Sequence, residues 1–170
     1  MIRPLILTLL FASGLFALTL GTPPPEVTIG GDDGSTVGGE SWSSSSLRGK
    51  VHILFYVDPD EKETNNALSE ALKAKAFDRS RYGSVAVINM AATWLPNFAI
   101  ASSLRAKQEK YPDTLYVKDK RRRLVHDWGI ADDSSDVLLF DKDGTLLYVH
   151  EGKVDAQGID TVITLIEEHL

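Results

Sequence analysis

Four acidic residues stand close together at one point of the 170-residue chain, where Asp58, Asp60, Glu61 and Glu63 surround Pro59. Carboxylate oxygens are the ligands that hard divalent cations prefer, so this cluster could hold calcium or magnesium. The same residues also fit the start of a helix, because Asp at the cap, Pro at the first position and Glu at the third form a common N-terminal pattern. We favour the capping interpretation, which explains the proline as well as the acids. We therefore predict no metal site and no cofactor.

A second set of residues could form a hydrolytic site. His126 is followed by Asp127, and Ser134 and Ser135 come soon after. A histidine that is oriented by a carboxylate can act as the general base for a serine nucleophile. A hydrolase that uses His126 or the clustered carboxylates is therefore the alternative function. Because no Gly-x-Ser-x-Gly motif is present, and neighbours in sequence rarely converge on one site, we predict no catalytic residue.

The chain contains no cysteine. This excludes thiol nucleophiles, thiolate-bound zinc and dithiol redox cycles, and with them thiol–disulfide oxidoreductase and peroxidase activity of the thiol kind. The formal net charge of −6 argues against a nucleic-acid partner. The one basic run, residues 118–123, is interpreted as a solvated loop face. The alternative is a patch for an anionic partner.

Residues 1–21 have the features of a secretory signal peptide. A single basic residue precedes a mostly apolar stretch, and Thr19 and Gly21 place small residues at the −3 and −1 positions of a cleavage site. We predict export to the periplasm with cleavage after Gly21 and no stable membrane insertion afterwards. An uncleaved anchor is the alternative. Residues 22–40, rich in Gly and Pro, are expected to form a leader before a single domain at residues 41–170.

The elements that must position these residues alternate between strands and helices. Residues 51–57 form a nearly continuous apolar run, which is typical of a strand buried on both faces. A helix with one apolar stripe follows the acidic cluster, and residues 85–90 have the pattern of a second buried strand, so the two strands should pair in parallel. Asp143-Gly144 between two apolar runs predicts a hairpin. The remaining predicted elements are strands at 27–29 and 114–117 and helices at 98–110 and 155–170. This order predicts an α/β fold, a three-layer sandwich with a mixed β-sheet.

Short motifs along the chain carry a resemblance to a known family. The segment Leu47-Arg48-Gly49-Lys50-Val51 is similar to the start of the first core strand in periplasmic thioredoxin-like proteins, and residues 139–144 match a later part of their sheet. From Trp42 to the C-terminus, the order and spacing of such motifs resemble the YtfJ family of exported bacterial proteins, within the thioredoxin-like superfamily. The resemblance implies a thioredoxin-like fold in the Gram-negative periplasm and no well-established activity. The other residues that carry it are Lys62, Asn65, Asn66, Glu70, Ala71, Asp127, Trp128, Ser134 and Ser135.

The resemblance also indicates where a partner would bind. Redox-active thioredoxins carry Trp-Cys-x-x-Cys where this chain has residues 59–63, and their cis-proline aligns near Ser135. Both features are replaced here. If the substrate-holding surface of such relatives is retained without its redox chemistry, Asp60, Glu63, Ser134 and Ser135 would line it. We therefore expect an exported, non-redox module that binds a protein or peptide, and its acidic side chains favour a basic partner.

Overall fold

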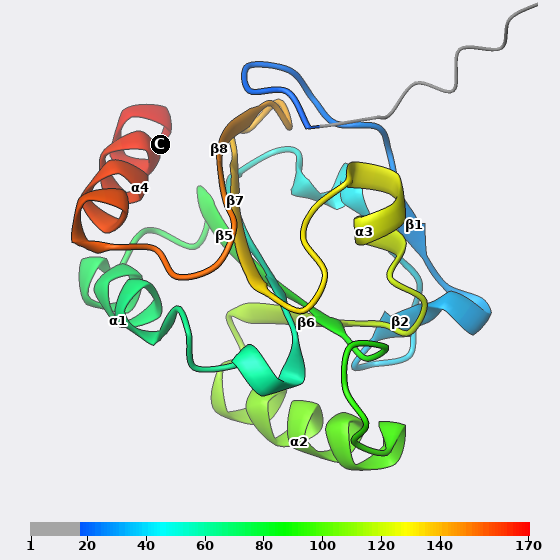
Figure 1. Cartoon of the computed structure of the whole chain (residues 1–170). Coiled ribbons are helices and arrows are strands. Elements are labelled where there is room, and N and C mark those ends of the chain that lie inside the picture. The colour runs from blue at the N-terminus through cyan, green and yellow to red at the C-terminus, as the bar shows by residue number, and fades with distance from the viewer. Residues whose placement is uncertain (1–17) are drawn as a thin grey trace, which may run out of the picture.

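The computed structural model describes residues 18–170 as a six-stranded sheet with helices on both faces (Figure 1). The strand order is β2-β6-β5-β4-β7-β8. Strands β4, β5 and β6 pair in parallel, while β7 runs antiparallel to β4, β8 to β7, and β2 to β6. The predicted parallel pair and the predicted hairpin are therefore both confirmed. The strands of this sheet are β2 (Gly34–Thr36), β4 (Val51–Val57), β5 (Tyr82–Asn89), β6 (Thr114–Asp119), β7 (Ser135–Phe140) and β8 (Leu146–His150).

Alternating side chains of the strands feed two apolar layers. One face of β4 places Ile53 against α1 (Asn66–Lys75) and α4 (Ala156–His169). The other face places Leu54 against Trp128 of α3 (Arg123–Trp128) and against the two-stranded sheet of β1 (Thr28–Ile29) and β3 (Trp42–Ser43). Helix α2 (Asn97–Lys110) covers β5 and β6 on the same side as α1. The result is the expected three-layer α/β sandwich with a mixed sheet.

Residues 22–40, expected as a leader, contribute two strands to this fold. Strand β1 pairs with β3, and β2 adds an edge strand to the main sheet beside β6. The segment is tied further by Trp128, whose indole Nε1 donates to the carbonyl oxygen of Pro25 at 2.8 Å. Residues 1–17 of the predicted signal peptide lie outside the described residues. Among residues 18–170, no helix is both long and apolar enough to cross a bilayer.

The helix predicted to begin at Asp58 begins later, which corrects the capping interpretation. Residues Pro59–Glu61 form one 3₁₀ turn, and α1 starts only at Asn66. Pro59 does occupy the first position of that turn, but the side chain of Asp58 makes no capping hydrogen bond. The acid expected to satisfy a helix end is instead turned into the protein. This leaves its carboxyl group to be explained in another way.

Candidate functional site

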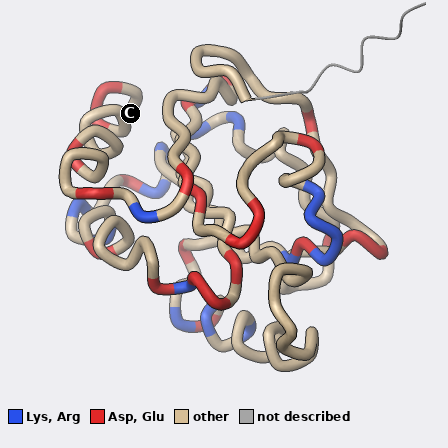
Figure 2. The backbone as a smooth tube through the Cα atoms, in the orientation of Figure 1, with Lys and Arg blue, Asp and Glu red and all other residues tan. Residues whose placement is uncertain are grey.

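Three chain segments meet where the parallel strands end. Asp58 follows β4, Asn89 is the last residue of β5, and Asp132-Asp133 precede β7. The backbone N–H of Asp58 donates to the carbonyl oxygen of Ser134 at 3.0 Å, which fixes the two loops side by side. Figure 2 shows acidic positions gathering at this point, near the centre of the view. Open α/β sheets usually hold their ligands at the carboxyl ends of parallel strands, so a ligand site is expected at this edge of the sheet.

Asp58 is a buried carboxyl group without a partner. The residue is 2% exposed, and neither carboxyl oxygen has a hydrogen-bond partner among the described residues. Burial, together with the nearby negative charges of Asp132 and Asp133, raises the pKa of Asp58 to about 7. A buried acid elsewhere in the sheet behaves differently: Asp119 accepts hydrogen bonds from the Tyr56 hydroxyl and from the N–H groups of residues 121 and 124. Unlike Asp119, Asp58 accepts no side-chain hydrogen bond that would compensate for the burial of its carboxyl group.

The neighbours of Asp58 form a small polar cluster. One oxygen from each of Asp58, Asp132 and Asp133 lies within 4.8 Å of the others. The Nδ2 of Asn89, a fully buried residue, donates to Asp132 at 2.8 Å, while its Oδ1 has no partner in the part of the chain described. On the outer side, the guanidinium of Arg122 lies 3.2 Å from the other oxygen of Asp132. Because Asp132 is about a third exposed (32%), the cluster opens to solvent on that side.

The four residues predicted to face a partner lie in the two loops that meet here, but not in one environment. Asp60 and Glu63 are exposed on the turn after β4, and Ser134 is half-buried. Ser135 differs from the expectation, since it is 2% exposed and its hydroxyl oxygen accepts from Asn65 Nδ2 at 3.1 Å. Its side chain therefore supports the fold of the loop rather than lying on the surface.

The residues of the alternative hydrolase do not assemble into a catalytic group. His126 is exposed on α3. Asp127, the carboxylate expected to orient this histidine, instead accepts hydrogen bonds from Nε and Nη2 of Arg123, at 3.0 and 2.7 Å. Within residues 18–170, no hydrogen bond joins the His126 side chain to Ser134 or Ser135. The geometry gives this histidine no orienting carboxylate and no nucleophile.

The basic run at 118–123 is mostly neutralised by neighbouring acids. Its first two residues belong to β6, and its last begins α3, so it is not one continuous loop. Arg123 lies 3.0 Å from Asp33 and Arg121 lies 3.8 Å from the same residue, while Arg122 pairs with Asp132. Figure 2 shows this basic segment flanked by acidic ones. Ion pairs of this kind leave little positive charge for an anionic partner.

A groove of about 560 Å³, which was not predicted from the sequence, lies between α1 and α2. The apolar side chains on this face of the sheet form two separate clusters, one under α1 and α4 and one under α2. The groove occupies the gap, with an apolar floor that includes Phe55, Ala86 and Tyr116. The one signal was the weak apolar stripe of α2, which buries only Ile100 and Leu104. The charged residues along its rim are Lys62, Lys73, Arg79, Lys107 and Lys110, with Glu70 and Asp113.

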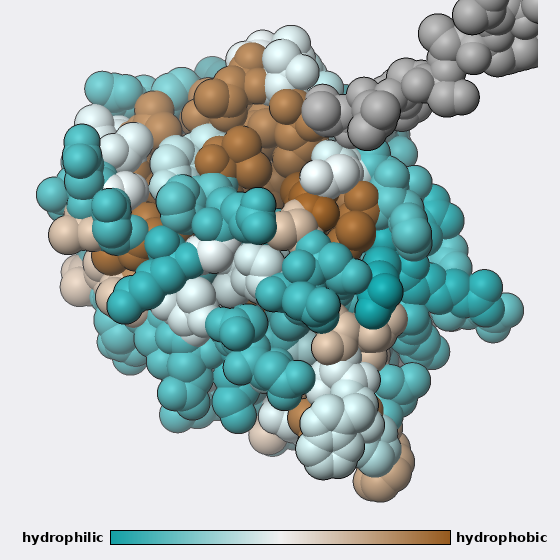
Figure 3. Space-filling view, in the orientation of Figure 1, coloured by the Kyte–Doolittle hydropathy of each residue, from teal (hydrophilic) through white to brown (hydrophobic). Residues whose placement is uncertain are grey.

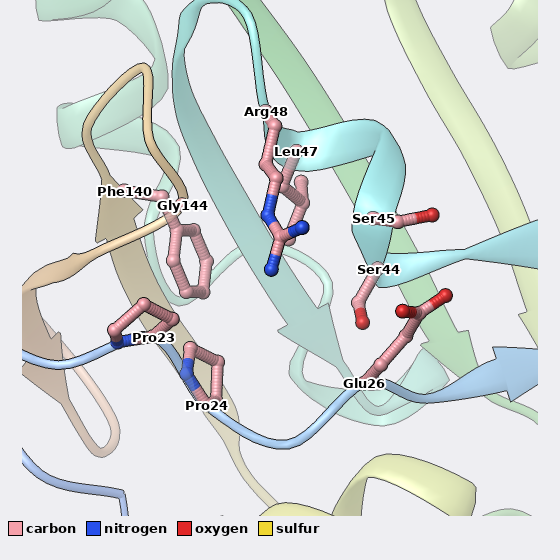
Figure 4. A pocket seen from close by; sticks show the side chains of 9 residues that line it. All are labelled: Pro23, Pro24, Glu26, Ser44, Ser45, Leu47, Arg48, Phe140 and Gly144. Carbon is pink, nitrogen blue, oxygen red and sulfur yellow. The ribbon is translucent and has the colours of Figure 1, made fainter.

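A second hollow lies on the other side of the sheet and is too small for a ligand. Its volume is about 20 Å³, room for about one water molecule. Figure 4 shows the Arg48 side chain beside the ring of Phe140, with its guanidinium pointing toward Pro24. This hollow is the seam along which the N-terminal segment packs on the hairpin. We assign it a structural role.

The sheet order and the two helical layers define a class of protein, the thioredoxin-like fold. The solved structure of "Thioredoxin-like superfamily protein SPOA0173" has a TM-score of 0.62 and 18% identity, and covers 87% of this chain and 96% of its own. A thiol-disulfide isomerase from Corynebacterium glutamicum has a TM-score of 0.58 and 16% identity, with 80% and 90% covered. These likenesses show the fold alone, and this chain has no cysteine for the chemistry named in the second.

Within that class, the chain belongs to the family described as "Bacterial protein of unknown function (YtfJ_HI0045)", whose pattern it matches over residues 29–169. The "Uncharacterized protein YtfJ" of Escherichia coli (strain K12) is 25% identical over 173 residues, spanning 98% of this chain and 94% of that relative. The resemblance noted from the sequence motifs is thereby confirmed. The match begins at Ile29, the last residue of β1, so it includes β2 and most of the segment expected as a leader.

Proposed function

We propose that this protein is an exported, non-redox binding module that holds an extended, acidic segment of a partner protein in the groove between α1 and α2. The observation that carries the proposal is the combination of an apolar floor with a basic rim. Apolar surface supplies affinity, and a charged rim selects the partner and speeds its approach.

The charge of the rim favours an acidic partner. Arg79 lies 3.6 Å from Asp113, and Lys73 lies 3.8 Å from Glu70, so these four charges balance in pairs. The remaining rim cations, Lys62, Lys107 and Lys110, have no ion pair among the described residues. Asp60 and Glu63, for which a basic partner was expected, are not among the residues that line the groove. The groove therefore favours an acidic partner and not the basic partner that was expected.

Lys107 gives the clearest reason for an anion in the groove. Burial lowers the pKa of its ammonium group, and the positive charge of nearby Lys62 lowers it further. A carboxylate bound between these two side chains would compensate both effects, because an opposite charge stabilises the ionised form. The partner's acidic side chains are therefore placed toward this end of α2.

The size of the groove fits a short stretch of extended chain. It runs beside α1, which has 10 residues and so is about 15 Å long at about 1.5 Å per residue. An extended peptide rises about 3.3 Å per residue, so roughly four or five residues would lie along it. Trp94, in the loop before α2, and Phe98, in its first turn, are 86% and 78% exposed and stand next in the chain to the groove-lining residues Leu95 and Ala99. Exposed aromatic side chains beside a groove favour a macromolecular partner over a small molecule.

A pair of synthetic peptides tests this proposal. A fluorescein-labelled peptide of alternating Leu and Glu should bind, and a peptide of alternating Leu and Lys should not. Binding should weaken with added salt, because exposed charges are screened. Lys107→Glu should reduce affinity at least about tenfold, since it replaces attraction by repulsion where the acidic side chains of the peptide are expected to bind. Equal binding of the two peptides, or an unchanged affinity of Lys107→Glu, would refute the proposal.

Two adjacent serines provide a matched control for the location. Ser102 and Ser103 are both exposed on α2, but only Ser103 lines the groove. A photoreactive benzoyl-phenylalanine at position 103 should crosslink the Leu-Glu peptide, and the same residue at position 102 should not. Crosslinking at both positions to the same extent would place the peptide outside the groove.

The export component of the proposal is supported by the pattern of residues 1–21. Its test is the N-terminal sequence of the protein recovered from the periplasmic fraction. The expected first residue is Thr22, directly after the predicted cleavage site. A protein that keeps Met1 and sediments with membranes would instead identify an anchor.

A further inference from the structure

The buried carboxyl group of Asp58 needs a positive partner that the protein does not provide. No lysine or arginine nitrogen lies within ion-pair distance of it among the described residues, and the guanidinium of Arg122 is paired with Asp132 instead. An unpaired carboxylate at this depth is strongly destabilising unless a positive charge or hydrogen bonds compensate for its burial. Asp132 and Asp133, which lie beside it, add two more carboxylates to the same place. The cluster therefore has the electrostatics of a cation site.

A neutral residue outside the acidic cluster points the same way. Asn89 comes from the end of a different strand and is 0% exposed. Its Nδ2 bonds to Asp132, and its amide also lies close enough to Asp58 to lower the pKa of that carboxyl group. The Oδ1 of the same amide has no partner in the described structure. A buried amide oxygen left in this state beside three carboxylates is a fourth oxygen available to a metal.

We infer that Asp58, Asp132, Asp133 and Asn89 form a binding site for calcium. The three carboxylates each offer an oxygen within 4.8 Å of the others. Two oxygens bound to one calcium at about 2.4 Å are at most about 4.8 Å apart, so the spacing suits a common ion. All four residues offer oxygen, and the set includes no histidine or cysteine, which argues against zinc.

Charge and access also suit a divalent cation. The three carboxylates carry a formal charge of −3, and Arg122 neutralises one of them from the outer side. The remaining −2 matches a divalent ion. Asp133 and the partly exposed Asp132 form the solvent side of the cluster, so the ion has a path of entry and room to keep water molecules as further ligands. Calcium is favoured over magnesium because it accepts irregular sets of six to eight oxygens, whereas magnesium requires a regular octahedron.

Binding would tie together two loops that a hydrogen bond already joins. Asp58 belongs to the loop after β4, and Asp132 and Asp133 belong to the loop before β7. The inference is independent of the proposed peptide groove, since none of the four ligands lines that groove.

Calorimetric titration of the full chain, stripped of metal with EDTA, tests this site. Calcium chloride should bind in a 1:1 ratio with a dissociation constant on the order of 10⁻⁴ M, as in exported calcium modules, and should raise the temperature of unfolding. Magnesium chloride should bind at least about tenfold more weakly. The absence of heat with about 10 mM of either ion would overturn the inference, and tighter binding of magnesium would overturn the assignment to calcium.

Three variants locate the ion. Asp133→Asn changes an exposed side chain and should leave the fold intact while weakening calcium binding at least about tenfold. Asp58→Asn should have the same effect on calcium, and circular dichroism would verify its fold. Asp60→Asn is the matched control, because it removes an exposed acid two residues from Asp58 that is outside the cluster. Equal calcium affinities of wild type and Asp133→Asn, or an equal loss in Asp60→Asn, would show that the ion is bound elsewhere.

Discussion

Asn65 joins three segments of the chain through one side chain, and its removal should be costly. The residue is 6% exposed and directly precedes α1. Its Nδ2 donates to the backbone oxygen of Ser135 and to that of Gly152, each at 3.0 Å, and its Oδ1 accepts from the N–H of Val154 at 2.9 Å. The amide thereby connects the start of α1 with β7 and with the loop between β8 and α4.

The magnitude follows from the groups that Asn65→Ala would leave without this partner. Val154 is 3% exposed, so its N–H would lose its bond with little access to water. Leaving a buried backbone group unpaired costs about 1–3 kcal/mol, and each of the two carbonyl oxygens would lose about 1 kcal/mol. We therefore expect Asn65→Ala to lower the free energy of unfolding by about 3–5 kcal/mol. Asn65→Asp should cost at least as much, because it directs a carboxylate oxygen at two carbonyl oxygens.

Urea unfolding followed by tryptophan fluorescence would measure this loss. The neighbouring residue provides the control: Asn66 is exposed at the first position of α1, so Asn66→Ala should change the free energy of unfolding by no more than about 0.5 kcal/mol. If Asn65→Ala cost less than about 1 kcal/mol, or no more than Asn66→Ala, the role of this amide as a link between the segments would be wrong.

Three further predictions concern the parts of the fold that surround the site. Burial lowers the pKa of His52 below its ordinary value of 6.5, so the unfolded chain binds a proton more readily than the folded protein, and stability should fall as the pH drops below about 6.5. In urea unfolding between pH 7.5 and 5, His52→Gln should flatten this dependence of stability on pH, and an unchanged slope would contradict the prediction. Gly34→Ala should lower the free energy of unfolding by more than about 2 kcal/mol, because φ is +145° and an added Cβ would meet the backbone of β6. The control Gly39→Ala, with φ of +103° and open space around it, should lose only about 1 kcal/mol through backbone strain, and similar losses in the two variants would refute the clash at Gly34. Trp128→Phe should lower the free energy of unfolding by about 2 kcal/mol, since it removes the hydrogen-bond donor to Pro25 and leaves a cavity. An unchanged urea midpoint would show that the hydrogen bond from Trp128 to Pro25 does not hold the N-terminal segment.

The expectations from sequence that proved accurate depend on local patterns. The strand at 51–57 has the predicted bounds because its apolar run fits only a strand buried on both faces. The hairpin around Asp143-Gly144 and the closing helix follow from turn chemistry and from a clear apolar stripe. The absence of cysteine excludes thiol chemistry whatever the fold. The α/β sandwich and the family resemblance were therefore available from the chain itself.

Asp58 shows where the sequence was insufficient. Its neighbours Pro59 and Glu61 have the types expected at a helix start, and nothing in the local pattern distinguishes a capping carboxylate from a buried one. The choice depends on the loop before β7, whose backbone binds Asp58 N–H from 76 positions further along the chain. Asn89 likewise had the appearance of an ordinary strand residue.

The sequence by itself determined the elements, their order and the exclusion of redox chemistry, because hydrophobic periodicity and residue type act over a few neighbouring residues. Only the tertiary structure decided that Asp58, Asn89, Asp132 and Asp133 share one site, and that α1 and α2 leave a groove with a basic rim between them. Both depend on distances between residues that are far apart in the chain. Figure 3 shows how the tertiary structure distributes hydropathy over one face: hydrophilic residues cover the central loops, and apolar residues gather between α4 and the N-terminal segment.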